Sequence, residues 1–391
     1  MSGSGTRRRL PAGAAFCLRA FLASRLALVL LGPMTVGLFP ARLEGLVGPG
    51  VPSPVFPPAD LWRSFLAVWE RFDALWFLRI AEQGYRSGDG SAAFFPGFPL
   101  AVRAVSTLLG GHPFAAGMLV ANAAFLSALV VVHRLTADER GEETARATVL
   151  GLCWFPTSMF FLMPYSESLF LLGAAGAFLA VRRERWAWAA AAGIVAGATR
   201  SIGVLLVPAF LLDAALRWRR GGARAVRAPL AAAVGVGAGF GVYLAWPAGG
   251  RLRTAVDVQA TWFREPSAPW NTVAEAVRIA FAQFGPGAGG YWMLDLVLVA
   301  LVVAGAVWIS PRIRPSYLVY LWGSILVPLA LPFPGRPLMS MPRFALTMFP
   351  AFWGLAELAR RLRLPTWTLA AFGAFGLGLF TALVVNGYYI F

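Results

Sequence analysis

Residues 186–216 read WAWAAAAGIVAGATRSIGVLLVPAFLLDAAL, and this stretch decides how the chain is threaded. Its charged residues are Arg200 and Asp213, and clusters of arginine flank it on both sides. Because the cytoplasmic loops of membrane proteins carry an excess of Lys and Arg, both flanks are expected on the same side of a membrane. One straight span cannot place them there. We therefore predict two short helices that turn near residues 198–201, since non-helical backbone is tolerated at membrane depth where protein or a water-filled cavity surrounds it.

The rest of the chain is similarly apolar. Of its 391 residues, 58% are hydrophobic and 13% are charged, and the mean hydropathy is +0.67. This composition excludes a soluble enzyme and a disordered tail. Further spans are predicted at 12–39, 114–132, 147–163, 165–181, 228–246, 291–309, 317–333, 344–358 and 366–391. Together with the hairpin they give an all-α polytopic membrane protein of about eleven membrane helices, with the N-terminus inside and the C-terminus outside.

The charges indicate a membrane rather than a nucleic acid as the partner. All 34 basic residues are Arg, and they form short clusters at the ends of apolar runs, where they orient the chain in a bilayer. Cys17 and Cys153 lie within apolar runs, so neither a disulfide framework nor a thiolate metal site is predicted. The chain also lacks Walker A, HExxH and GxSxG motifs and a DxD pair. No cofactor is predicted, and a divalent metal would have to bind without a DxD pair.

Two long segments, residues 40–113 and 249–290, are predicted to lie outside the membrane within a single domain, 1–391. In the first, residues 69–85 read WERFDALWFLRIAEQGY. At 100° per residue, Asp73 shares one helical face with Trp69 and Phe77, which is typical of a helix at the membrane interface. A carboxylate in such surroundings can accept a proton from a hydroxyl group. Alternatively, Asp73 caps a helix that begins at Ala74.

Four other polar residues are candidates for binding. Glu167 lies where two spans meet at the external side, and it either contacts a hydroxyl of a substrate or forms a structural ion pair with Arg200. Arg200 lies at the turn of the hairpin, where a helix end and a guanidinium could hold an anion. Arg336 and Arg343 lie at the external ends of later spans, and arginine is well suited to bidentate phosphate binding. For Arg343, the alternative is that the side chain reaches to lipid headgroups.

Five blocks resemble, in order, those of the PIG-V-like mannosyltransferases, the group that contains GPI mannosyltransferase II and its bacterial relatives. The blocks are residues 71–85, FFPGFPL at 94–100, PYSESLF at 164–170, ATRS at 198–201 and PRF at 342–344. Phe72 and Gly97 depart from the residues expected in the first two blocks. The resemblance implies a GT-C glycosyltransferase with an external active site, an inverting mechanism and a lipid-phosphate sugar donor. The exclusive use of Arg favours a multi-pass protein of a bacterial plasma membrane.

The residues support the same reaction by a separate argument. No nucleotide sugar is available outside the cytosol, so a polyprenyl-phosphate mannose is the expected donor, and its phosphate is already a good leaving group. One base therefore suffices, whereas a glycosidase needs two carboxylates. We predict Asp73 as the base, Arg343, Arg200 and Arg336 as phosphate ligands, and Glu167 with Tyr165 as contacts of a lipid or glycan acceptor. The alternative is a transporter or lipid flippase, in which the same charged groups would form a relay.

Overall fold

A computed structural model describes residues 12–38, 65–86, 88–246, 264–285 and 290–388. The arginines at 7–9, the Pro- and Gly-rich part of the first external segment at 40–58, and Asp257 and Trp262 of the second lie outside these ranges.

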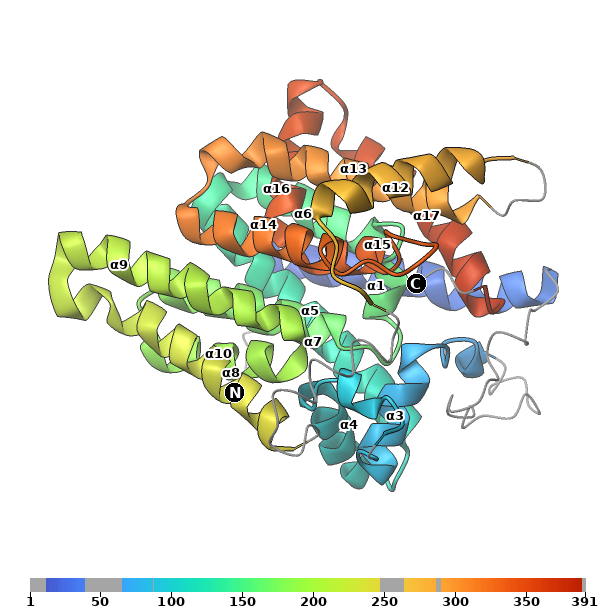
Figure 1. Cartoon of the computed structure of the whole chain (residues 1–391), viewed down its shortest axis with the longest axis horizontal. Helices are drawn as coiled ribbons and strands as arrows, with labels where there is room; N and C mark the ends of the chain where they lie inside the picture. Colours follow the sequence, from blue (N-terminus) through green and yellow to red (C-terminus); the bar gives the residue numbers. More distant parts are fainter. Residues whose placement is uncertain (1–11, 39–64, 87, 247–263, 286–289, 389–391) are drawn as a thin grey trace, which may run out of the picture.

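The described residues form a bundle of α-helices without a strand, in which the long helices run side by side (Figure 1). Five helices are long and apolar enough to cross a membrane, and four shorter helices are also apolar. This confirms an all-α polytopic membrane protein, while the count of eleven spans stays a prediction. The helices are α1 (Ala12–Leu38), α3 (Asp73–Gln83), α4 (Gly97–Leu108), α5 (Pro113–Arg140), α6 (Glu142–Trp154), α7 (Glu167–Arg182), α8 (Trp186–Thr199), α9 (Leu206–Ala225), α10 (Arg227–Ala245), α12 (Pro269–Ala282), α13 (Tyr291–Ile309), α14 (Pro315–Leu329), α15 (Met341–Phe344), α16 (Phe349–Arg361) and α17 (Thr366–Val385).

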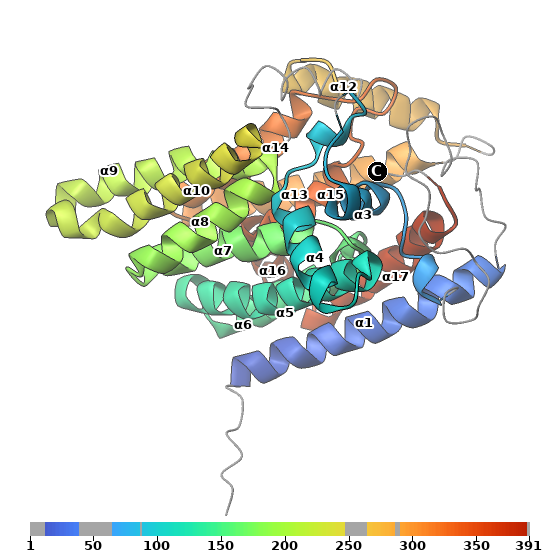
Figure 2. The same ribbon diagram turned by 90° about the horizontal axis from the view of Figure 1, so that it is seen from below.

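The hairpin predicted from residues 186–216 turns at the expected place. Helix α8 ends at Thr199, Arg200 is extended with a φ of −151°, and a 3-10 turn at Ser201–Leu205 leads into α9. Helices α8, α9 and α10 extend together from one side of the molecule (Figures 1 and 2). The turn brings Arg200 to the inner end of this group of helices, where the cavity described below lies.

Glycines fix the contact between α8 and α10. A β-carbon at Gly197 would lie 2.1 Å from the carbonyl oxygen of Val236, and one at Gly239 would lie 2.2 Å from that of Ile194. Gly193 and Gly235 make equally close approaches. Each helix thus carries a GxxxG motif, which lets two helices in lipid approach to backbone contact.

Prolines bear on two helix boundaries. The span predicted at 147–163 ends as a helix at Trp154, because Pro156 disfavours helical backbone in the residue before it. Conversely, Pro96 and Pro99 do not prevent a helix from starting at Gly97, since the first turn of a helix needs no backbone N–H donors.

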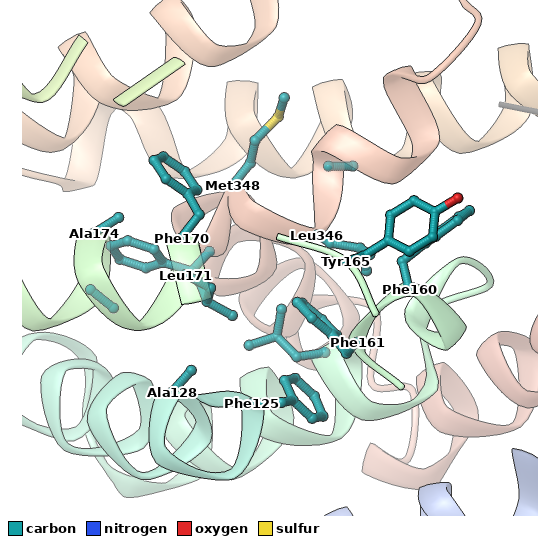
Figure 3. Packing of buried hydrophobic residues seen from close by; sticks show 14 of the residues in the cluster. Phe125, Ala128, Phe160, Phe161, Tyr165, Phe170, Leu171, Ala174, Leu346 and Met348 are labelled. Carbon is teal, nitrogen blue, oxygen red and sulfur yellow. The ribbon is translucent and has the colours of Figure 1, made fainter. Parts of the chain in front are cut away.

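Helices α3 and α4 pack together on one side of the bundle, with α4 against α5 (Figure 2). Helix α3 buries Phe77 of the predicted apolar face, and also Leu75, Leu78 and Ile80, so protein surrounds most of it. Beneath it lies an aromatic core in which Phe125 and Phe161 stack with ring centroids 4.1 Å apart (Figure 3). This core holds the start of α3 in place beside α7 and α15.

Candidate active site

A partly enclosed cavity of about 230 Å³ gathers charged side chains from distant parts of the chain. Asp73 comes from α3, Glu167 from the start of α7, Arg200 from the turn of the hairpin and Arg343 from α15. Four of the six predicted site residues therefore meet at one cavity. Its remaining wall is largely apolar and includes Phe94, Phe95, Val327, Leu331 and Phe344.

Asp73 is the first residue of α3 and points to an arginine rather than to its own helix. The residue at the cap position is Phe72, and no side chain caps the helix. The Asp73 carboxylate accepts a hydrogen bond from the Arg343 guanidinium, and its side chain stays 21% exposed. The alternative that Asp73 only caps a helix beginning at Ala74 is therefore wrong.

Arg343 connects the two carboxylates of the site. Its Nε lies 3.4 Å from Oε1 of Glu167, and its guanidinium carbon lies 5.3 Å from the centroid of the Phe344 ring. Burial alone would lower the pKa of Arg343, but the carboxylates of Asp73 and Glu167 outweigh this effect and raise it. The guanidinium is therefore a permanent cation in a mostly apolar cavity.

Glu167 forms the ion pair with Arg200 that sequence analysis gave as one of two alternatives. The Arg200 guanidinium donates to Oε1 of Glu167 and, over 3.2 Å, to the hydroxyl of Ser166. The second carboxylate oxygen of Glu167, Oε2, is buried and has no hydrogen-bond partner among the described residues. Because a buried carboxylate oxygen is costly to leave without a partner, Oε2 can still accept a bond from a ligand.

The other two predicted residues do not line the cavity. The Arg336 guanidinium forms an ion pair with the buried carboxylate of Asp295 in α13, at a distance of 2.7 Å. The two residues are 41 positions apart, and no local sequence motif indicates the pair. Tyr165 places its hydroxyl against the backbone of residues 71 and 73.

Two further residues that line the cavity, Ser324 and Arg264, were not predicted as site residues. The hydroxyl of Ser324 in α14 is buried, lines the wall and has no partner among the described residues. Arg264 also lines the cavity and donates to the carbonyl oxygen of Leu331 over 2.9 Å. Ser324 lies in a plain apolar helix and gives no sequence signal. Arg264 lies in the second segment predicted outside the membrane, where nothing in the sequence sets it apart from the other charges.

Gly97, one of the departures from the family pattern, has a structural reason. A β-carbon there would lie 2.8 Å from the carbonyl oxygen of Ala198 and 2.8 Å from the hydroxyl oxygen of Thr199. The start of α4 is therefore pressed against the turn that carries Arg200. Within the described ranges, no three His, Cys, Asp or Glu side chains gather closely enough to hold a metal ion.

Comparison with known proteins finds a solved structure with a similar fold and related sequences. The crystal structure of ArnT from Cupriavidus metallidurans bound to undecaprenyl phosphate superposes with a TM-score of 0.52 at 13% identity, covering 97% of this chain and 78% of that one. This likeness shows a shared fold, that of a polytopic helical membrane protein. The model of the family "Mannosyltransferase (PIG-V)" matches residues 17–210. The chain is therefore similar to this family over 194 of its 391 residues.

Two curated relatives are similar over a shorter stretch. GPI alpha-1,6-mannosyltransferase 2 of Rattus norvegicus is 33% identical over 162 residues, and that of Mus musculus is 34% identical over 162 residues. In both cases the match covers 38% of this chain and 33% of the relative. The chain therefore spans about a third of the length of the curated relatives it matches.

Proposed function

We propose that this protein transfers a mannosyl residue from a polyprenyl-phosphate donor to a hydroxyl group of a lipid-linked or protein acceptor, with inversion at the anomeric carbon. The active site would open at the external face of a bacterial plasma membrane. The observation that carries the proposal is the pairing of Asp73 with Arg343 on the wall of one cavity. A base and a phosphate ligand are the two groups that such a transfer requires.

The reaction needs one proton acceptor and one anion site. Asp73 takes the proton of the acceptor hydroxyl as its oxygen attacks the anomeric carbon of the sugar. The bond from that carbon to the phosphate oxygen breaks, and the electron pair leaves with the phosphate. Attack from the face opposite the phosphate inverts the configuration. Arg343 and Arg200 stabilise the charge that develops on the leaving phosphate, so no general acid is required.

The ion pair between Asp73 and Arg343 also makes donor binding precede proton transfer. In the ligand-free protein the Asp73 carboxylate is engaged by the Arg343 guanidinium. A bound donor phosphate competes for Arg343 and thereby releases Asp73 for the acceptor hydroxyl. Glu167 keeps Arg343 and Arg200 in place, and its free Oε2 is positioned to orient a hydroxyl group of the acceptor.

The test is a transfer assay with purified protein in liposomes, supplied with labelled polyprenyl-phosphate mannose and lipid or peptide acceptors. We expect the anomeric configuration of the mannoside product to be opposite to that of the donor. A β-linked donor would give an α-mannoside, and an α-linked donor a β-mannoside. Retention of configuration would contradict the mechanism. Movement of a lipid across the bilayer without formation of a glycoside would instead support a transporter or flippase.

We further propose that the transfer needs no divalent metal ion, because the leaving phosphate meets arginines in the cavity. Transfer is expected to proceed at an unchanged rate after removal of divalent ions with EDTA. A loss of activity that added Mg²⁺ or Mn²⁺ restores would contradict this part of the proposal.

A further inference from the structure

The residue before the proposed base has an unusual backbone conformation. Phe72 has a φ of 54° and a ψ of −121°, in a region that residues other than glycine rarely adopt. Strained residues of this kind persist only where surrounding contacts hold them, and they concentrate at functional sites. Because Asp73 follows directly, the conformation of Phe72 sets the direction in which α3 begins and the Asp73 side chain points.

One hydroxyl group spans this strained residue. The Tyr165 hydroxyl accepts a hydrogen bond from the backbone N–H of Asp73 and donates one to the carbonyl oxygen of Arg71, each over 3.1 Å. The two peptide groups on either side of Phe72 are thus tied to the same oxygen atom. No other residue type at position 165 combines this reach with both a donor and an acceptor at the tip of a rigid ring.

The ring of Tyr165 is itself fixed. The residue is 1% exposed, and the centroid of its ring lies 4.8 Å from that of Phe160 and 6.1 Å from that of Phe77. Its hydroxyl points out of the aromatic core (Figure 3). The guanidinium carbon of Arg343 lies 5.5 Å from the centroid of the same ring. Tyr165 therefore contacts both the backbone that carries the base and the cation that faces the phosphate.

We propose that Tyr165 is a positioning residue, whose hydroxyl holds Phe72 in its strained conformation and so aims Asp73 at the acceptor hydroxyl. The inference rests on the proposed role of Asp73 as the base. It differs from the expectation that Tyr165 contacts the acceptor, because Tyr165 acts here through the backbone of its neighbour. Loss of the hydroxyl alone would then slow the chemical step and leave donor binding intact.

The test compares Tyr165→Phe with Tyr243→Phe. Tyr243 is also buried, and its hydroxyl donates to the backbone carbonyl oxygen of Ala92 over 2.8 Å, so the control measures the loss of a similar hydrogen bond elsewhere. For Tyr165→Phe we expect kcat to fall by about tenfold to a hundredfold, because small errors in the position of a reacting group have effects of this size. The KM for the donor should change less than about twofold, since the groups that bind the phosphate remain.

Two outcomes would overturn the inference: a kcat for Tyr165→Phe equal to that of Tyr243→Phe, or a rise in donor KM without a fall in kcat. If Tyr165→Phe does not fold, the double variant Tyr165→Phe with Phe72→Gly relieves the strain and is compared with Phe72→Gly alone. A lower kcat in the double variant is expected, and equal values would overturn the inference. Full activity of Asp73→Asn would instead contradict the proposed function itself.

Discussion

The carboxylate of Asp73 and the guanidinium of Arg343, 270 residues apart in the chain, form an ion pair on the wall of a single cavity. The pair joins the start of α3 to the short helix α15, so the proposed base and the proposed phosphate ligand neutralise each other until a substrate arrives. Under the proposed mechanism, an anion that separates the pair frees the carboxylate to act as the base.

Arg343→Lys should weaken donor binding more than Arg336→Lys does. Lysine keeps the charge but lacks the planar fork that binds two phosphate oxygens, and one lost charge-assisted hydrogen bond costs about 1.5–3 kcal/mol. We therefore expect the donor KM to rise by roughly tenfold to a hundredfold in Arg343→Lys. Arg336 is the matched control, because it also pairs with a buried carboxylate but does not line the cavity. A rise for Arg336→Lys as large as that for Arg343→Lys would contradict the assignment of Arg343 as the phosphate ligand.

Ser324→Ala should impair substrate binding without affecting folding. The Ser324 hydroxyl lines the cavity without a partner among the described residues, and a neutral hydrogen bond to a sugar hydroxyl contributes about 0.5–1.5 kcal/mol. The donor KM is therefore expected to rise by about twofold to tenfold. Ser316 lies on the same helix, is equally buried and also lacks a partner in the part of the chain that the structure describes, but it does not line the cavity. Equal kinetics for Ser324→Ala and Ser316→Ala would remove Ser324 from the site.

Gly239→Ala should destabilise the pairing of α8 with α10. The added methyl group would lie 2.2 Å from the carbonyl oxygen of Ile194, so the helices must separate, at a cost of about 1–3 kcal/mol for an overpacked contact. Gly237 of the same helix has open space at this position, and Gly237→Ala should be neutral or stabilising by up to about 1 kcal/mol. Thermal unfolding in detergent measures both. Similar unfolding midpoints for the two variants would contradict the close helix contact.

Patterns that depend on nearby residues were predictable from the sequence. The apolar runs predicted the spans, and the flanking arginines predicted the turn at residues 198–201. Asp73 was identified because a carboxylate within an aromatic helical face is unusual. Helix α12 was missed, because a stretch of 14 residues is too short to register as a span.

Contacts between distant residues were not predictable in the same way. Nothing near Arg336 in the sequence indicates its partner Asp295, and an apolar helix gives no sign that Ser324 faces a cavity. The positive φ of Phe72 also gives no signal in the sequence, because the hydroxyl that bonds to its flanking peptide groups belongs to Tyr165, 92 positions from Asp73. In each case the three-dimensional packing, and not a local preference, determines the outcome.

The most direct test of the account is the rate of mannosyl transfer by Asp73→Asn, measured beside Asp89→Asn with saturating donor. Asp89 belongs to the same segment and pairs with Arg79 over 2.6 Å, but it does not line the cavity. The account predicts that Asp73→Asn still binds the donor and transfers about a hundredfold to ten-thousandfold more slowly, the range for loss of a general base. Asp89→Asn should keep nearly the full rate. An Asp73→Asn protein that transfers mannose as fast as Asp89→Asn would contradict the central claim.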